Sequence, residues 1–454
     1  MAMSADQAAR GGSPAVLTLA FRPFFFAASL WSALALALWI VMFMTGLALP
    51  SRFDPLTWHI HEMLFGFVPA AIAGFMLTAI PNWTGRPPIH GAPLALLVLL
   101  WALGRIACLI SALVPLWAAA AVDLAFPFVL CAVAAREIVA ARNWRNLAMP
   151  VPIAVLGIAY LLMYLENAGF AVPEGLGWRL GLAAIIALIS VIGGRIIPSF
   201  TRSWLAKRGV ATAPAAHDLI DRSALGALHA GLWGWAFLPA FRPLGALLLL
   251  AALLNLWRFG RWRGVATLSE PLLAILHLGY LWVIVGAALL GATMLSNAVP
   301  EAGAIHALTA GAIGTMVIAV MTRVARGHTG RPLEAGHITT LIYLMISAAA
   351  MCRVAASFAG RSSMLLLGVS AVLWIASFTL FAIRYGPWLA SRRTDELSPR
   401  CRRARRGRPP QGAGADVGIS EPGTAVPAPR HGCTRRRSGC STTTPPTSSI
   451  GRRS

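Results

Sequence analysis

The chain has 454 residues, of which 57% are hydrophobic and only 12% are charged. Soluble globular proteins carry about a quarter charged residues, so this composition, with a mean hydropathy of +0.70, excludes an ordinary soluble enzyme. The net charge of +22 would suggest a nucleic-acid partner, but ten of these charges come from residues 391–454 and the others form short clusters between apolar runs. Such clusters are typical of the cytoplasmic loops of membrane proteins. We therefore expect a lipid bilayer, and no nucleic acid, as partner.

Twelve apolar segments follow one another along the chain, and each is close to the roughly 20 residues that a transmembrane helix needs. They predict an all-α polytopic membrane protein with about twelve transmembrane helices in one domain, residues 1–390. Residues 391–454 are basic and rich in Ser, Thr and Pro, which predicts a disordered cytoplasmic tail. The predicted segments are 24–46, 60–80, 92–112, 114–135, 147–165, 178–199, 223–241, 243–258, 270–293, 304–324, 337–358 and 363–386.

The distribution of basic residues predicts the orientation. Counting from a cytoplasmic N-terminus, the inner loops collect nearly all the loop arginines, for example Arg136, Arg142 and Arg145, whereas the outer loops hold little beyond Arg52, Arg242 and Arg361. Because cytoplasmic loops are enriched in Lys and Arg, both termini are expected in the cytoplasm.

An internal repeat relates the second and tenth segments. At an offset of 245 residues, Ile60-His61 aligns with Ile305-His306, and the Thr-Gly-Arg-Pro of residues 84–87 aligns with that of residues 329–332. A fainter match at an offset of 117 brings in the sixth segment, where Trp178 occupies the position of the histidine. Self-similarity of this kind is typical of repeat architectures, and it predicts three repeats of four helices.

His61 and His306 are the first candidates for a cofactor site. The repeat puts them at one depth on helices that run in the same direction, and two opposed imidazoles can ligate a haem iron axially. Arg105 and Arg353 are also related by the repeat and could pair with the haem carboxylates. The alternative is that the histidines bond to backbone at helix ends and that the arginines reach to the membrane surface.

Two neighbours of His61 add to this candidate site. A spacing of two residues places His59 and His61 on different faces of a helix, so they cannot easily hold one ion. His59 could serve a second metal or hold a propionate or Glu62. Glu62 could orient a ligand or carry a proton, or it could simply favour the start of a helix.

His229 and His277 lie inside the seventh and ninth segments. They could form a copper site, with Met or Cys as softer ligands. Each could instead be a lone histidine that bonds a neighbouring helix.

Several stretches resemble the NnrS family of bacterial membrane proteins: FRPFFFAASLW at 21–31, WHIHEMLFGFVPAAIAGFMLTAIPNWTGRPP at 58–88, LWALGR at 100–105, LHLGYLW at 276–282, and the segment that begins IHALTAGAIGTM at 305. The resemblance covers residues 15 to about 390. It implies a multi-pass protein of the bacterial inner membrane that contains haem b and copper and is associated with nitric oxide, denitrification and protection from nitrosative stress. It implies functional importance for His59, His61, Glu62 and His306, but it assigns no reaction.

Three functions follow as hypotheses. The first is a haem- and copper-binding protein that senses or scavenges nitric oxide, or that transfers electrons received from a donor protein or a quinol. The second is a quinol-linked redox enzyme, and the third is a transporter of a metal, haem or a small metabolite. Whether the protein keeps a cofactor during purification separates the transporter from the other two.

Overall fold

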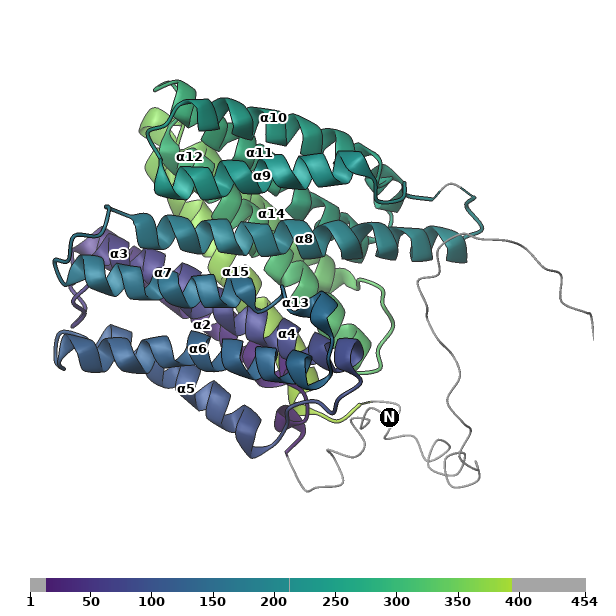
Figure 1. The fold of residues 1–454 in the computed structure, drawn as a ribbon, viewed down its shortest axis with the longest axis horizontal. Coiled ribbons are helices and arrows are strands. Elements are labelled where there is room, and N and C mark those ends of the chain that lie inside the picture. Colours follow the sequence, from purple (N-terminus) through teal and green to yellow (C-terminus); the bar gives the residue numbers. More distant parts are fainter. Residues whose placement is uncertain (1–13, 212, 394–454) are drawn as a thin grey trace, which may run out of the picture. The chain divides into compact units, whose positions relative to one another are not determined.

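Most of the described chain is helical, as the apolar segments predict (Figure 1). The structure is a computed structural model that describes residues 14–211 and 213–393, so the predicted tail lies outside the described residues from residue 394 onward. Within the described ranges there is no β-strand. The α-helices are α2 (Phe21–Thr45), α3 (Pro55–His61), α4 (Val68–Thr84), α5 (Ala92–Leu109), α6 (Leu116–Ala140), α7 (Val151–Asn167), α8 (Leu176–Lys207), α9 (Leu219–Phe237), α10 (Pro243–Gly260), α11 (Pro271–Leu295), α12 (Glu301–His306), α13 (Thr315–His328), α14 (His337–Ala356) and α15 (Ser363–Ala390).

Two π-helices complete the second and tenth predicted segments. The π-helix η2 (Glu62–Phe67) joins α3 to α4, and the π-helix η5 (Ala307–Gly314) joins α12 to α13. Four short 3-10 helices lie in the connections: η1 (Ala15–Leu17), η3 (Trp144–Asn146), η4 (Gly264–Thr267) and η6 (Gly360–Ser362).

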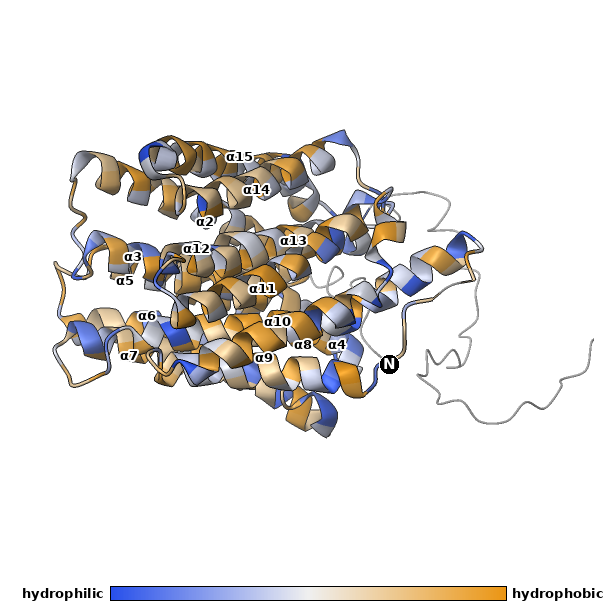
Figure 2. Cartoon of the chain, turned by 90° about the horizontal axis from the view of Figure 1, so that it is seen from above, coloured by the Kyte–Doolittle hydropathy of each residue, from blue (hydrophilic) through white to orange (hydrophobic). Residues whose placement is uncertain are grey.

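All twelve predicted segments are helical, and eleven helical spans in the described part are long and apolar enough to cross a membrane. The other segment is α9, whose first turn contains Asp221 and Arg222. Figure 2 shows hydrophobic residues along most of the helices and hydrophilic residues concentrated towards their ends. Arg22, near the start of α2, donates to the backbone carbonyl of Leu389 near the end of α15 at 2.9 Å. The two ends of the helical part therefore lie next to each other.

Local sequence explains where the second segment begins and ends. The Asp54 carboxylate accepts hydrogen bonds from the backbone N–H groups of Leu56 and Thr57, and Pro55 occupies the first turn of α3, where its missing N–H costs nothing. The segment ends at Gly85, whose φ of 68° suits a residue without a Cβ.

The second and tenth segments share local features at the offset of 245 that relates their sequences. Each breaks into a π-helix directly after its histidine, His61 or His306. Thr84 and Thr329 each bond the carbonyl four residues back, at 2.8 and 2.7 Å. These correspondences support a relationship between the two segments. The scheme of three units of four helices stays a prediction.

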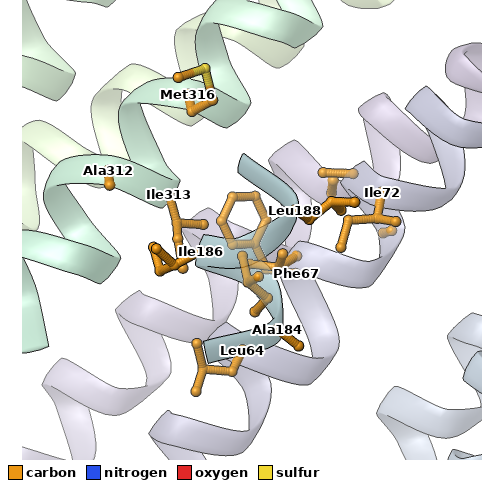
Figure 3. Packing of buried hydrophobic residues seen from close by; sticks show 14 of the residues in the cluster. Leu64, Phe67, Ile72, Ala184, Ile186, Leu188, Ala312, Ile313 and Met316 are labelled. Carbon is orange, nitrogen blue, oxygen red and sulfur yellow. The ribbon is translucent and has the colours of Figure 1, made fainter. Parts of the chain in front are cut away.

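The three segments that the repeat relates are also the most buried spans. In an apolar 18-residue window of each span, the buried share is 83% within residues 55–84, 72% within 301–328 and 67% within 176–207, against 61% or less in each other candidate span. Residues from the three segments meet in the core, where Phe67, Leu188 and Ile313 lie close together (Figure 3). The repeat-related helices therefore form the centre of the protein, and the histidines of two of them lie beside it.

Candidate functional site

A cavity of about 310 Å³ lies where the three central segments meet α2, α14 and α15. Its volume is at the lower end of the range of small-molecule sites, about 300–1,000 Å³. Most of its wall is apolar and aromatic. The polar and charged residues that line it are His59, His306, Arg353, Glu301, Thr309 and Ser370.

His306 is the last residue of α12, and its ring is fixed by one hydrogen bond. Its Nδ1 atom lies 2.8 Å from the carbonyl oxygen of Ala302. A carbonyl can only accept, so Nδ1 carries the proton and Nε2 keeps its lone pair. This is the arrangement of most metal-binding histidines, whose second nitrogen donates to a carbonyl or a carboxylate.

His59 lies in α3 and lines the same cavity. Its ring stacks on Trp39 of α2, with the ring centres 4.3 Å apart and the planes 28° from parallel. Its Nδ1 atom has almost no accessible surface and no hydrogen-bond partner among the described residues. The ring of His59 therefore lines the cavity, but Nδ1 is not the part of it that faces a ligand.

Arg353 of α14 brings a positive charge to the cavity wall. It is half-buried, and within residues 14–393 it has neither a hydrogen bond nor an ion pair. Glu301, which also lines the cavity, is exposed at the first position of α12. An uncompensated charge within a membrane span is expensive. The cavity therefore suits a ligand with an anionic group.

His61 faces away from this cavity and is fully buried in a separate polar cluster. Its Nδ1 atom hydrogen-bonds Glu62 Oε1 at 3.1 Å. Its Nε2 atom lies 3.1 Å from Asp123 Oδ2, although without the angle of a hydrogen bond. The rings of Phe53 and Tyr160 pack around it at 5.1 and 5.5 Å. Both ring nitrogens of His61 therefore face carboxylates, which leaves neither directed at a cofactor.

Arg105 holds this cluster together. Its guanidinium donates to both Glu62 oxygens, at 2.9 and 2.8 Å, and also bonds Asp123. Tyr164 donates to the other oxygen of Asp123 at 2.9 Å, and Trp31 donates to Glu62 at 2.7 Å. Two carboxylates and one guanidinium leave one negative charge, which a doubly protonated His61 would balance. Balanced charges and shared hydrogen bonds allow this many polar groups to be buried together.

Two glycines make room for the cluster. A Cβ added at Gly66 would lie 2.5 Å from Glu62 Oε2, and one added at Gly104 would lie 2.8 Å from Asp123 Oδ1. No real Cβ tolerates such contacts, so any side chain at either position would push the charged groups apart.

His61, Glu62 and Cys108 are the one group of described residues with the spacing of a metal site, because their ligand atoms lie within 4.8 Å of one another. The Cys108 sulfur lies 3.5 Å from His61 Nδ1. The donor chemistry nevertheless disagrees with a metal, since Arg105 and Trp31 already use the Glu62 oxygens. A cation would also lie beside a guanidinium. The cluster is better described as a closed ion network.

His229 and His277 bond different positions of α8. His229 Nε2 lies 2.8 Å from the Ser190 hydroxyl, and His277 Nε2 lies 3.4 Å from that of Thr201. Those partners are eleven residues apart on one helix, which corresponds to about 16 Å at 1.5 Å per residue. The structure therefore does not bring these two histidines together, and each bonds a neighbouring helix.

The six residues predicted to bind a cofactor thus divide into two groups. His59, His306 and Arg353 line the cavity, whereas His61, Glu62 and Arg105 belong to the ion network. The separation of His59 from His61 follows their spacing of two residues. The histidine that lines the same cavity as His306 is His59, not His61. Arg105 bonds the carboxylates of Glu62 and Asp123, so its partners are groups of the protein itself.

Sequence reasoning missed the roles of Trp39, Asp123 and Cys108. Asp123 had a usable signal, because a carboxylate in an apolar segment needs a cation and Arg105 is one of few within the spans. Trp39 and Cys108 had none, since an aromatic or a cysteine in an apolar run is ordinary core material.

Comparison with known proteins supports one assignment. The sequence model of the NnrS protein family matches residues 15–393, which includes every helix described above. A search of curated proteins finds no match. The chain belongs to the NnrS family.

Proposed function

We propose that this protein binds haem b in the cavity between His59 and His306 and acts in the nitric oxide response of a bacterium, in denitrification or in protection from nitrosative stress. The observation that carries the proposal is the shared cavity: two histidine rings and an arginine that has no hydrogen bond or ion pair among the described residues line one small space. We place the protein in the inner membrane with both termini in the cytoplasm, as the loop arginines predict.

The cavity residues fit a haem by their donor chemistry. Nε2 of His306 would ligate iron, and the Nδ1–H bond to Ala302 would hold the ring in the ligating tautomer. His59 would be the second ligand, with Trp39 fixing its ring plane by stacking. Arg353 would pair with a haem carboxylate and so neutralise both charges in the membrane. When bound, haem supplies an iron that exchanges an electron, and that takes a diatomic ligand where one of the two histidines is displaced.

The ion network has a supporting role in this proposal. Glu62 directly follows α3 and is three residues from His59. The hydrogen bonds that Arg105 and Trp31 donate to Glu62 therefore hold the backbone within one helical turn of His59. The network thereby holds α3 against α2 and α5 and keeps the His59 ring on the cavity side. Arg105 acts here as a positioning residue.

Copper stays a prediction. His229 and His277 are held on different turns of α8. The group of His61, Glu62 and Cys108 is closed by Arg105. Neither set fits a copper ion as it stands, and no step of the proposed function depends on one. The reduction of the haem by a donor protein or a quinol is likewise a prediction.

Nitric oxide titration tests the proposed function. The full-length protein would be purified in detergent, shown to be monodisperse and helical, reduced, and titrated with nitric oxide while its absorption spectrum is recorded. A saturable shift of the haem bands supports the proposal. A folded protein that carries haem but shows no shift contradicts the nitric oxide role, and a folded protein without haem favours the transporter hypothesis.

A further inference from the structure

A second cavity of about 80 Å³ lies between α4, α8 and α13, and we call it the inner cavity. Its wall consists of aliphatic, aromatic and methionine side chains and one glycine, with no ionisable or hydroxyl-bearing side chain. Ile72, Leu188 and Met316 contribute to it from the three central segments, and Figure 3 labels all three among the packed buried side chains. Apolar cavities of this kind stay dry and accept apolar guests such as xenon.

The two cavities are neighbours. Val68 and Ile313 line both of them, and these side chains are only 3% and 2% exposed. They therefore form the wall between the inner cavity and the larger cavity that His59 and His306 line.

The far end of the inner cavity is formed by Phe75, Ile196 and Val320. These side chains are half-buried, in contrast to Val68 and Ile313. That end therefore lies nearer the surface of the helical bundle, within segments that are apolar enough to face lipid hydrocarbon.

We infer that the inner cavity is a docking site for an uncharged apolar molecule of two or three atoms, which passes Val68 and Ile313 to reach the histidine cavity. The size excludes a larger guest, and the absence of polar wall groups excludes an ion or a strongly hydrated molecule. That the physiological guest is nitric oxide rests on the proposed function. That the cavity binds small apolar molecules does not depend on the proposed function.

Xenon tests the docking site without any cofactor. Crystals of the full-length protein would be pressurised with xenon and the anomalous scattering measured. We expect a xenon peak bounded by Ile72, Leu188, Ile313 and Met316. Xenon peaks elsewhere in the protein with none at this position would overturn the docking site, whether or not the protein contains haem.

Gas-binding kinetics test the route. Ile313→Phe narrows the passage, Val68→Leu is a gentler second variant, and Val372→Phe on the exposed face of α15 is a matched control. In the reduced haem protein, we expect carbon monoxide to rebind after flash photolysis several-fold more slowly in the first two variants, with a smaller change in equilibrium affinity. Unchanged rates in folded Ile313→Phe and Val68→Leu proteins would overturn the route. Loss of haem from the wild-type protein would instead refute the proposed function and leave the xenon result to decide the cavity.

Discussion

The Nδ1 atom of His306 lies 2.8 Å from the carbonyl oxygen of Ala302, one turn earlier in the same helix. This bond assigns the proton to Nδ1 and leaves Nε2 able to bind a metal. His61, at the equivalent position of the other repeat copy, has both ring nitrogens against carboxylates instead. The two histidines therefore share an aligned position and a following π-helix but have different hydrogen-bond partners.

Removing the charge of Arg353 is expected to weaken the binding of haem. Arg353 has no partner within residues 14–393, so a haem carboxylate would be its counter-ion. A hydrogen bond to a charged group contributes about 1.5–3 kcal/mol, which corresponds to roughly ten- to a hundredfold in affinity. Haem transfer from the Arg353→Ala protein to a soluble haem acceptor measures this change.

Arg353→Lys and Arg361→Ala provide the controls. The lysine variant keeps the charge and should retain part of the affinity. Arg361 lies in the short helix η6 at an exposed position, so its removal should change nothing. Equal haem transfer from Arg353→Ala and Arg361→Ala would show that Arg353 does not bind the haem.

Breaking the ion network is expected to destabilise the fold strongly. Arg105 is 2% exposed and bonds two carboxylates. Arg105→Leu would leave both carboxylates buried without their cation, a change that costs about 3–5 kcal/mol. Thermal unfolding in detergent should show a lower midpoint for Arg105→Leu, with Arg361→Leu close to wild type. An unchanged midpoint for Arg105→Leu would mean that the network does not stabilise the protein.

Gly66 provides a steric test of the same network. A methyl group at this position would lie 2.5 Å from Glu62 Oε2 and 2.8 Å from Arg105 Nη1. Overpacking of this kind costs about 1–3 kcal/mol, so Gly66→Ala should unfold at a lower temperature. Gly368→Ala is the matched control, because nothing lies within 4 Å of its added Cβ and alanine favours a helix. Equal unfolding temperatures for the two variants would show that the space beside Gly66 is not needed by Glu62 and Arg105.

His229 and His277 are expected to be independent of any bound copper. Each bonds a hydroxyl on a different part of α8, so neither has the other as a second ligand. We expect His229→Ala and His277→Ala to contain the same copper per protein as wild type, as measured by mass spectrometry of the purified protein. A parallel loss of copper from both variants would restore the copper site that the sequence suggested.

The sequence was sufficient for the helical architecture. Runs of about 20 apolar residues cannot leave their backbone groups unpaired in a bilayer, so each had to become a helix. The sequence was less accurate about helix boundaries. The segment predicted at 60–80 extends from Pro55 to Thr84 in the structure, because Asp54 and Pro55 begin α3 earlier than hydropathy alone suggests.

The candidate site was harder to predict than the fold. The match between the second and tenth segments drew attention to the start of two central helices, but it could not say which of His59 and His61 lines the cavity with His306. That depends on the direction of α3 and on the π-helix after it, which no residue pattern announces. The contact of Arg105 with Asp123 was equally hard to predict, because it depends on how α5 and α6 pack against each other.

The most direct test of the account is the reduced-minus-oxidised absorption spectrum of the detergent-purified protein, recorded with its His306→Ala, His59→Ala and His61→Gln variants. The account predicts b-type haem bands in wild type, their loss in His306→Ala and His59→Ala, and bands that persist in whatever fraction of His61→Gln remains folded. Folded wild-type protein without haem bands, or bands that survive in His306→Ala and His59→Ala but vanish from folded His61→Gln, would contradict it.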